Sequence, residues 1–82
     1  MKHEGNAKTN NMNALQKKTF LRFKERLEEM LPSFRIAWAL GVEKDFIELH
    51  LETDKRTYRN SLMASKLATE VEDETGVTII LR

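Results

Sequence analysis

The sequence predicts one α+β domain in which two antiparallel helices pack on one face of a three-stranded mixed sheet. Three observations lead to this prediction. Apolar residues recur with a helical period in two segments, alternate with polar residues in two others, and end in a short β-branched segment. The resulting order is α-β-β-α-β, and 82 residues leave room for a single domain.

The chain is predicted to begin with a disordered tail, 1–12, followed by the domain, 13–82. The tail lacks periodicity and contains Gly and several Asn residues. Asn13 is expected to cap the first helix, and Gln16 stands where a capping box needs its second partner. Pro32 ends the helix, because the residue before a proline avoids helical geometry.

Two alternating segments, 33–42 and 45–52, are predicted to form a hairpin across the polar link Glu43-Lys44. In the first strand the large side chains are expected to face the helices and the small ones the opposite side: Phe34, Ile36, Trp38 and Leu40 against Ala37 and Ala39. In the second strand the same rule places Ile47, Leu49 and Leu51 inward and Phe46, Glu48 and His50 outward. The large inward side chains of 33–42 predict a central position for that strand.

The second helix is expected to start after an N-cap at Asp54 and to end near Thr75, with Gly76 behind it. A short strand, 77–81, follows, with Ile80 facing outward. Because a helical crossover between two strands of one sheet is normally right-handed, this strand should run parallel to 45–52. One face of the sheet is then left open.

Both helices have charges that oppose the helix dipole, with basic residues first and acidic residues last. The first has Lys17 and Lys18 near its start and Glu28 and Glu29 at its end. The second begins with Lys55, Arg56 and Arg59 and ends with Glu70, Glu72, Asp73 and Glu74. Antiparallel packing would place the basic start of each helix beside the acidic end of the other, so that Glu28 and Glu29 meet Arg56 and Arg59.

Several classes of protein are disfavoured by what the sequence lacks. It has no cysteine for a disulfide or a thiolate zinc site, no apolar leader, and no apolar segment long enough to span a membrane. It shows no nucleophile–base pair and no glycine-rich phosphate loop. We therefore expect a cytoplasmic protein that is not an enzyme and binds no cofactor, metal or membrane.

One cluster of titratable residues lies on the outward side of the second strand. Glu48, His50 and Glu52 alternate there, so an imidazole stands between two carboxylates. Alternate residues on a strand are about 6.5–7 Å apart, however, which is too far for a shared metal ion without convergence from elsewhere. The sequence favours a solvated sheet face over a metal or acid–base site.

The function that the sequence favours is a non-enzymatic protein-interaction or regulatory module. Docking is expected through the open sheet face or an edge strand, because an uncovered face with Phe and Ile resembles a binding surface. The predicted contact residues are Ala37, Ala39, Phe46 and Ile80. The partner is another protein or a second copy of the chain, which would give a homodimer.

The alternative is a small nucleic-acid-binding accessory protein. Six residues at the helix starts would contact phosphates or stack on a base: Lys17, Lys18, Lys55, Arg56, Tyr58 and Arg59. The net charge of +1 argues against this function.

The α-β-β-α-β order over residues 13–82 is similar to that of type II KH domains, and this resemblance implies nucleic-acid binding. The matching loop, 53–57, reads Thr-Asp-Lys-Arg-Thr and lacks the Gly-x-x-Gly of RNA-binding KH domains. No binding residue is carried over from the resemblance, which is one of topology.

Overall fold

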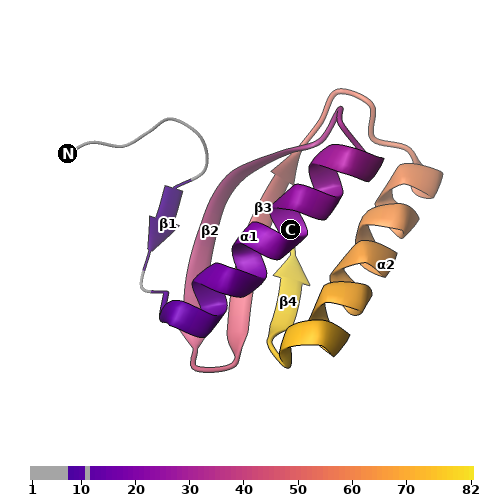
Figure 1. Cartoon of the computed structure of the whole chain (residues 1–82). Coiled ribbons are helices and arrows are strands. Elements are labelled where there is room, and N and C mark those ends of the chain that lie inside the picture. The colour runs from indigo at the N-terminus through magenta and orange to yellow at the C-terminus, as the bar shows by residue number, and fades with distance from the viewer. Residues whose placement is uncertain (1–7, 11) are drawn as a thin grey trace.

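The computed structural model describes residues 8–10 and 12–82, which form two helices and a four-stranded sheet (Figure 1). The elements are, in chain order, β1 (Lys8–Asn10), α1 (Ala14–Met30), β2 (Arg35–Glu43), β3 (Phe46–Glu52), α2 (Tyr58–Thr75) and β4 (Thr78–Leu81). The predicted α+β class and the α-β-β-α-β order of residues 13–82 are confirmed. Both helices lie on the same side of the sheet and run in opposite directions, as predicted.

The strands follow one another across the sheet in the order β1-β2-β3-β4. The hairpin strands β2 and β3 are antiparallel, and β4 is parallel to β3, as the crossover rule predicted. The expectation that 33–42 would be the centre of three strands was wrong, because β3 lies between β2 and β4. The right-handed crossover through α2 delivers β4 to the free side of β3 and not to that of β2.

Strand β1 was not predicted. Residues 8–10 were assigned to the disordered tail, but their backbone pairs in parallel with Trp38, Ala39 and Leu40 of β2. A strand of three residues is too short for alternation to be visible in the sequence. The remainder of the predicted tail, apart from Met12, lies outside the described residues.

A β-bulge in β2 decides which side chains face the helices. Ile36 pairs with Leu51 and Trp38 with His50, so Ala37 is an extra residue without a partner on β3. One inserted residue moves the side chains that follow it to the opposite face, here as far as the second register shift between Gly41 and Glu43. The placement of Trp38 and Leu40 inward and Ala39 outward was therefore wrong.

The core lies between the helices and the inner face of the sheet. Ala39 is fully buried there, whereas Trp38 and Leu40 are half-buried on the other face. The predicted inward residues of β3 are confirmed, since Ile47, Leu49 and Leu51 are buried. The other large core side chains come from the helices, from the loop that follows α1, and from the two ends of the sheet: Phe20, Phe23, Leu27, Leu31, Phe34, Ile36, Leu67, Val71, Val77 and Ile79.

The helix ends are fixed by short-range hydrogen bonds. The predicted capping box is confirmed, because the Asn13 side chain accepts from the Gln16 amide at 2.8 Å and the Gln16 side chain accepts from the Asn13 amide at 2.8 Å. The N-cap of α2 is Thr57, three residues after the predicted Asp54, and its hydroxyl accepts from the Asn60 amide. Gly76 ends α2 with a φ of 80°, as predicted for a left-handed C-cap.

Gln16 also connects α1 to the hairpin. Its side chain is almost fully buried, and its amide group donates to the carbonyl oxygens of Glu43 and Phe46, the latter at 2.7 Å. These two carbonyls flank the β2–β3 turn, so one side chain ties the start of the helix to the turn. The oxygen of the same amide completes the capping box.

We expect Gln16→Ala to lower the free energy of unfolding by about 2 kcal/mol, because it removes half of the capping box and two buried hydrogen bonds to the hairpin. Urea denaturation of the variant and the parent protein measures this. Gln16→Glu should also be destabilising, since a carboxylate can accept from Asn13 but cannot donate to the hairpin. The exposed neighbour Lys17 gives the control Lys17→Ala, for which a change within about 0.5 kcal/mol is expected. A Gln16→Ala protein as stable as the control would contradict the proposed connection.

A candidate interaction surface on the open sheet face

Two aromatic side chains stack on the face of the sheet that the helices leave open. The ring of Trp38 on β2 lies 5.5 Å from that of His50 on β3, centroid to centroid, and the two planes are 10° apart. These residues are direct cross-strand partners. The stack exists because the bulge at Ala37 turns Trp38 away from the core and onto the face occupied by His50.

Apolar side chains surround the stack. Leu40 and Ile80 both lie beside Glu48 in the register of β3, and Phe46 lies at the hairpin end of the same strand. Phe46 is 37% exposed, whereas Leu40 and Ile80 are half-buried. We refer to the five residues as the open-face patch: Trp38, Leu40, Phe46, His50 and Ile80. Neither α1 nor α2 covers it, because both lie on the opposite face (Figure 1).

Two ion pairs lie on the same face of the sheet as the patch. Arg82, which follows β4, donates to the carboxylate of Glu48, whose side chain is 16% exposed. Arg35 and Glu52 are cross-strand partners with 3.8 Å between the guanidinium and the carboxylate. Each pair sums to zero, so these four residues add no net charge to this face.

The line of Glu48, His50 and Glu52 does not form a common site. Each of these side chains has a different neighbour, respectively Arg82, Trp38 and Arg35. Within residues 8–10 and 12–82, no three His, Asp or Glu side chains are grouped so that they could hold a metal ion.

The four predicted contact residues have separate locations. Phe46 and Ile80 belong to the open-face patch, whereas Ala39 is buried beneath the helices and Ala37 is half-buried at the bulge. Sequence reasoning missed Trp38 and Leu40 as surface residues. Ile36 to Leu40 are apolar throughout, so alternation is satisfied with either set facing the core, and the sequence has no signal that locates the extra residue.

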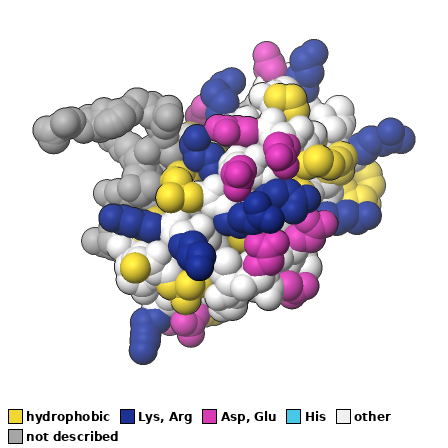
Figure 2. All heavy atoms as spheres, in the orientation of Figure 1, with side chains coloured by type: hydrophobic (Ala, Val, Ile, Leu, Met, Phe, Trp, Pro, Cys, Tyr) yellow, Lys and Arg dark blue, Asp and Glu magenta, His cyan; other side chains and the backbone are white. Residues whose placement is uncertain are grey.

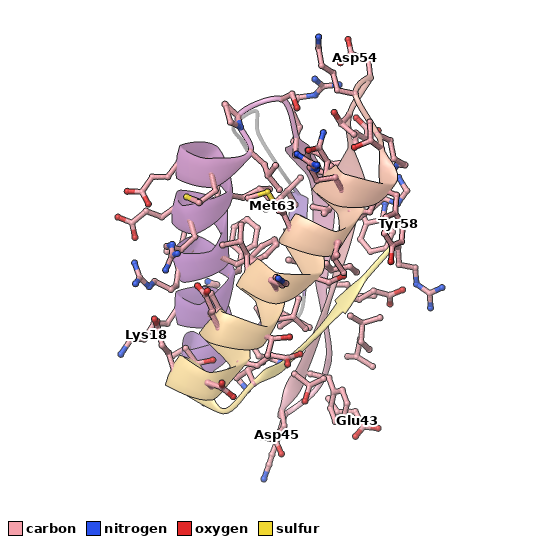
Figure 3. The ribbon with its side chains drawn as sticks, turned by 90° about the vertical axis from the view of Figure 1, so that its right-hand side faces the viewer. Lys18, Glu43, Asp45, Asp54, Tyr58 and Met63 are labelled. Carbon is pink, nitrogen blue, oxygen red and sulfur yellow. The ribbon has the colours of Figure 1, made fainter. Side chains whose placement is uncertain are left out.

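The six residues of the nucleic-acid alternative are divided between two ends of the molecule. Lys17 and Lys18 lie at the start of α1, and the other four lie at or just before the start of α2, which runs the opposite way. Figure 3 shows Lys18 and Tyr58 at opposite ends of the helical layer. The 18 residues of α2 separate these ends by about 27 Å. The two groups therefore do not form one surface.

Arg56 is engaged within the fold. Its guanidinium donates to the carbonyl oxygen of Leu51 at 3.1 Å and lies 5.9 Å from the centre of the Phe34 ring. Tyr58, by contrast, is 83% exposed and does not pack over the sheet. Near the start of α2, the ring of Tyr58 is therefore exposed, whereas the guanidinium of Arg56 contacts the end of the sheet.

Ion pairs join the helices at one end, as predicted. Arg22 of α1 contacts Glu74 of α2 at 2.9 Å, and Arg26 contacts Glu70 at 3.1 Å. Basic and acidic groups alternate over this helical face (Figure 2). The pairing expected at the other end was wrong. Glu28 and Glu29 bind Lys24 and Arg26 of their own helix, at 2.8 and 3.8 Å.

The Arg22–Glu74 pair shifts the pKa of both partners. Hydrogen bonds from Arg22 stabilise the ionised form of Glu74 and lower the pKa of its carboxyl. The same hydrogen bonds, together with those to Glu25, raise the pKa of the Arg22 guanidinium. The basic residues on this face of α1 are therefore committed to carboxylates, which leaves fewer of them for a phosphate backbone.

Comparisons with known proteins found no relative: no protein-family model matches the chain, and neither curated proteins nor solved structures give a match. The similarity to type II KH domains remains one of element order. None of the helices in the described part of the chain is long and apolar enough to cross a membrane. The candidate surface therefore has to be judged on its own geometry.

The lowered pKa of Glu74 predicts how acid affects stability. The folded-state pKa lies below the ordinary value of 4.5, so the ion pair contributes fully above that value and its contribution is lost as the pH falls through the folded-state pKa. The difference in free energy of unfolding between the parent protein and Glu74→Gln should be largest above about pH 5.5 and shrink on acidification. Added sodium chloride should reduce it as well.

Urea denaturation between neutral pH and pH 3 measures this difference. Asp73→Asn is the matched control, because it removes the same charge from the same helix end at an exposed residue. Equal pH dependence in the two variants would contradict a specific role for the contact with Arg22.

Proposed function

We propose that the protein is a non-enzymatic interaction module that binds a second copy of itself through the open-face patch. The observation that supports this most directly is the stacked pair of Trp38 and His50 on the face that the two helices leave open. A half-exposed tryptophan among Leu, Phe and Ile side chains is typical of the centre of a protein–protein interface. The hydrophobic core lies between the helices and the opposite face of the sheet, so the patch residues are not part of it.

The charges around the patch favour a protein over a nucleic acid. Binding to a phosphate backbone depends on unpaired Lys and Arg residues that release counterions. Arg35 and Arg82 are instead held by Glu52 and Glu48, and the acidic partners would face the phosphates. A protein partner whose binding surface has a low net charge fits these two ion pairs better than a phosphate backbone does.

A second copy satisfies this requirement. In a two-fold dimer the same surface is used on both sides, so each copy contributes the same two ion pairs. Arg35 and Arg82 of one copy can then lie opposite the carboxylates of the other without an excess of either charge. Face-to-face packing of two sheets is a common arrangement, with the sheets about 10 Å apart.

The area of the open face indicates how tightly two copies should associate. The four strands have 3, 9, 7 and 4 residues. With a rise of about 3.3 Å per residue and about 4.8 Å between strands, they cover roughly 360 Å² per copy in plan. Stable interfaces bury about 800 Å² per partner. We therefore expect a reversible dimer whose population grows with protein concentration.

Trp38→Ser should weaken this association at least about tenfold, because the largest apolar side chain of the patch is removed. Sedimentation equilibrium over a series of concentrations measures the dimer fraction. Ile80→Lys should have the same effect through a charge placed on the other side of the patch. Leu62→Ser is the control, since Leu62 is 45% exposed on α2, outside the patch, and its loss should leave association unchanged.

Circular dichroism of each variant should show that the fold is kept, and a Trp38→Ser protein that fails to fold leaves Ile80→Lys as the test. A parent protein that stays monomeric at millimolar concentration would overturn the proposal. So would association that is unaffected in both patch variants. Shifts of Trp38 and its neighbours in NMR spectra on adding a short oligonucleotide would instead point to single-stranded nucleic acid as the ligand of this face.

A further inference from the structure

Strand β4 forms one edge of the sheet, and its backbone amides alternate in direction. The amides of Thr78 and Arg82 donate toward β3, to the carbonyl oxygens of Asp45 at 2.7 Å and Leu49 at 2.8 Å. By alternation, the amides of Ile79 and Leu81 point away from β3. In the described part of the chain β4 is the last strand of the sheet, so these amides face the side where a further strand would pair.

Glu72 occupies part of that edge. Its carboxylate accepts a hydrogen bond from the Ile79 amide at 2.8 Å, in the position that the carbonyl oxygen of an added strand would take. Glu72 is half-buried in the last turn of α2 and reaches β4 across the turn at Gly76. Figure 3 looks onto this side of the molecule, where α2 runs beside β4.

The other carboxylates nearby have different partners. Glu70 and Glu74 bind the arginines of α1, as described above. Glu72 is turned to the opposite side of α2, because residues two apart on a helix lie about 200° apart around its axis. The acidic end of α2 therefore binds α1 on one side and contacts the edge of the sheet on the other.

We propose that the β4 edge is a latent strand-addition site that Glu72 keeps closed, and that the partner it fits is the β4 edge of a second copy. The segment Thr78–Leu81 reads Thr-Ile-Ile-Leu, with three β-branched residues and no charge, which is favourable for pairing with another strand. Two copies of one edge pair antiparallel about a two-fold axis, so each supplies the same groups to the other.

This contact differs from the face-to-face contact proposed above and does not depend on it. A two-fold axis perpendicular to the sheet joins the two sheets edge to edge and keeps all four helices on one side. Removing the carboxylate leaves the Ile79 amide without its acceptor, and the carbonyl of a second strand replaces it. Glu72 thus keeps this edge from pairing with a second strand.

Glu72→Ala tests the proposal, with Asp73→Ala as the control that loses the same charge from the neighbouring, exposed position. The first measurement is hydrogen–deuterium exchange of the Ile79 amide by NMR in dilute protein. We expect exchange at least about tenfold faster in Glu72→Ala than in the parent, and no change in the control, because a hydrogen bond to a carboxylate is lost.

The second measurement is the mass by light scattering at rising concentration. Glu72→Ala should form larger species than the parent protein and the control. It should do so even when combined with Trp38→Ser, which weakens the face-to-face contact. The combined variant thus separates failure of this proposal from failure of the first. The inference is overturned if the Ile79 amide exchanges equally fast in parent and variant, or if Glu72→Ala adds no mass to the Trp38→Ser protein.

Discussion

The extra residue at Ala37 is the constraint on which the surface of this protein depends. Before the bulge, Ile36 is the residue of β2 that faces the helices. After the bulge, Ala39 faces them. Without it Trp38 would lie in the core and the open face would present two alanines. With it, Ala39 lies beneath the helices, and Trp38 lies on the other side of the sheet.

The two layers are held together by interactions at several points. At the hairpin end, Gln16 satisfies the helix cap and two carbonyls of the turn region with one buried amide. Between the helices, Arg22 and Arg26 reach the acidic end of α2. At the sheet edge, Glu72 connects the same helix end to β4. Together these contacts orient both helices over one face and leave the other face free.

Much of this architecture follows from the sequence. The helices, the hairpin and the last strand have clear periods, and Asn13, Gln16 and Gly76 have the chemistry of helix ends. What the sequence does not locate is a bulge in a stretch that is apolar on both sides, or a three-residue strand such as β1. Phe46 and Ile80 face outward as predicted, whereas Trp38 and Leu40, which the sequence assigns to the core, lie on the same outer face. The edge contact of Glu72 depends on three-dimensional proximity, for which residue spacing gives no signal.

The reversed charges of the helices have a consequence for how the chain folds. Each helix alone has basic groups where its dipole is positive and acidic groups where it is negative, so an isolated peptide of either segment is weakened by its own charges. The penalty at Glu70 and Glu74 is offset when Arg22 and Arg26 come within reach, which requires both segments and the intervening hairpin to be in place. Helix formation and assembly are thereby coupled, and partly folded forms with a single helix are disfavoured.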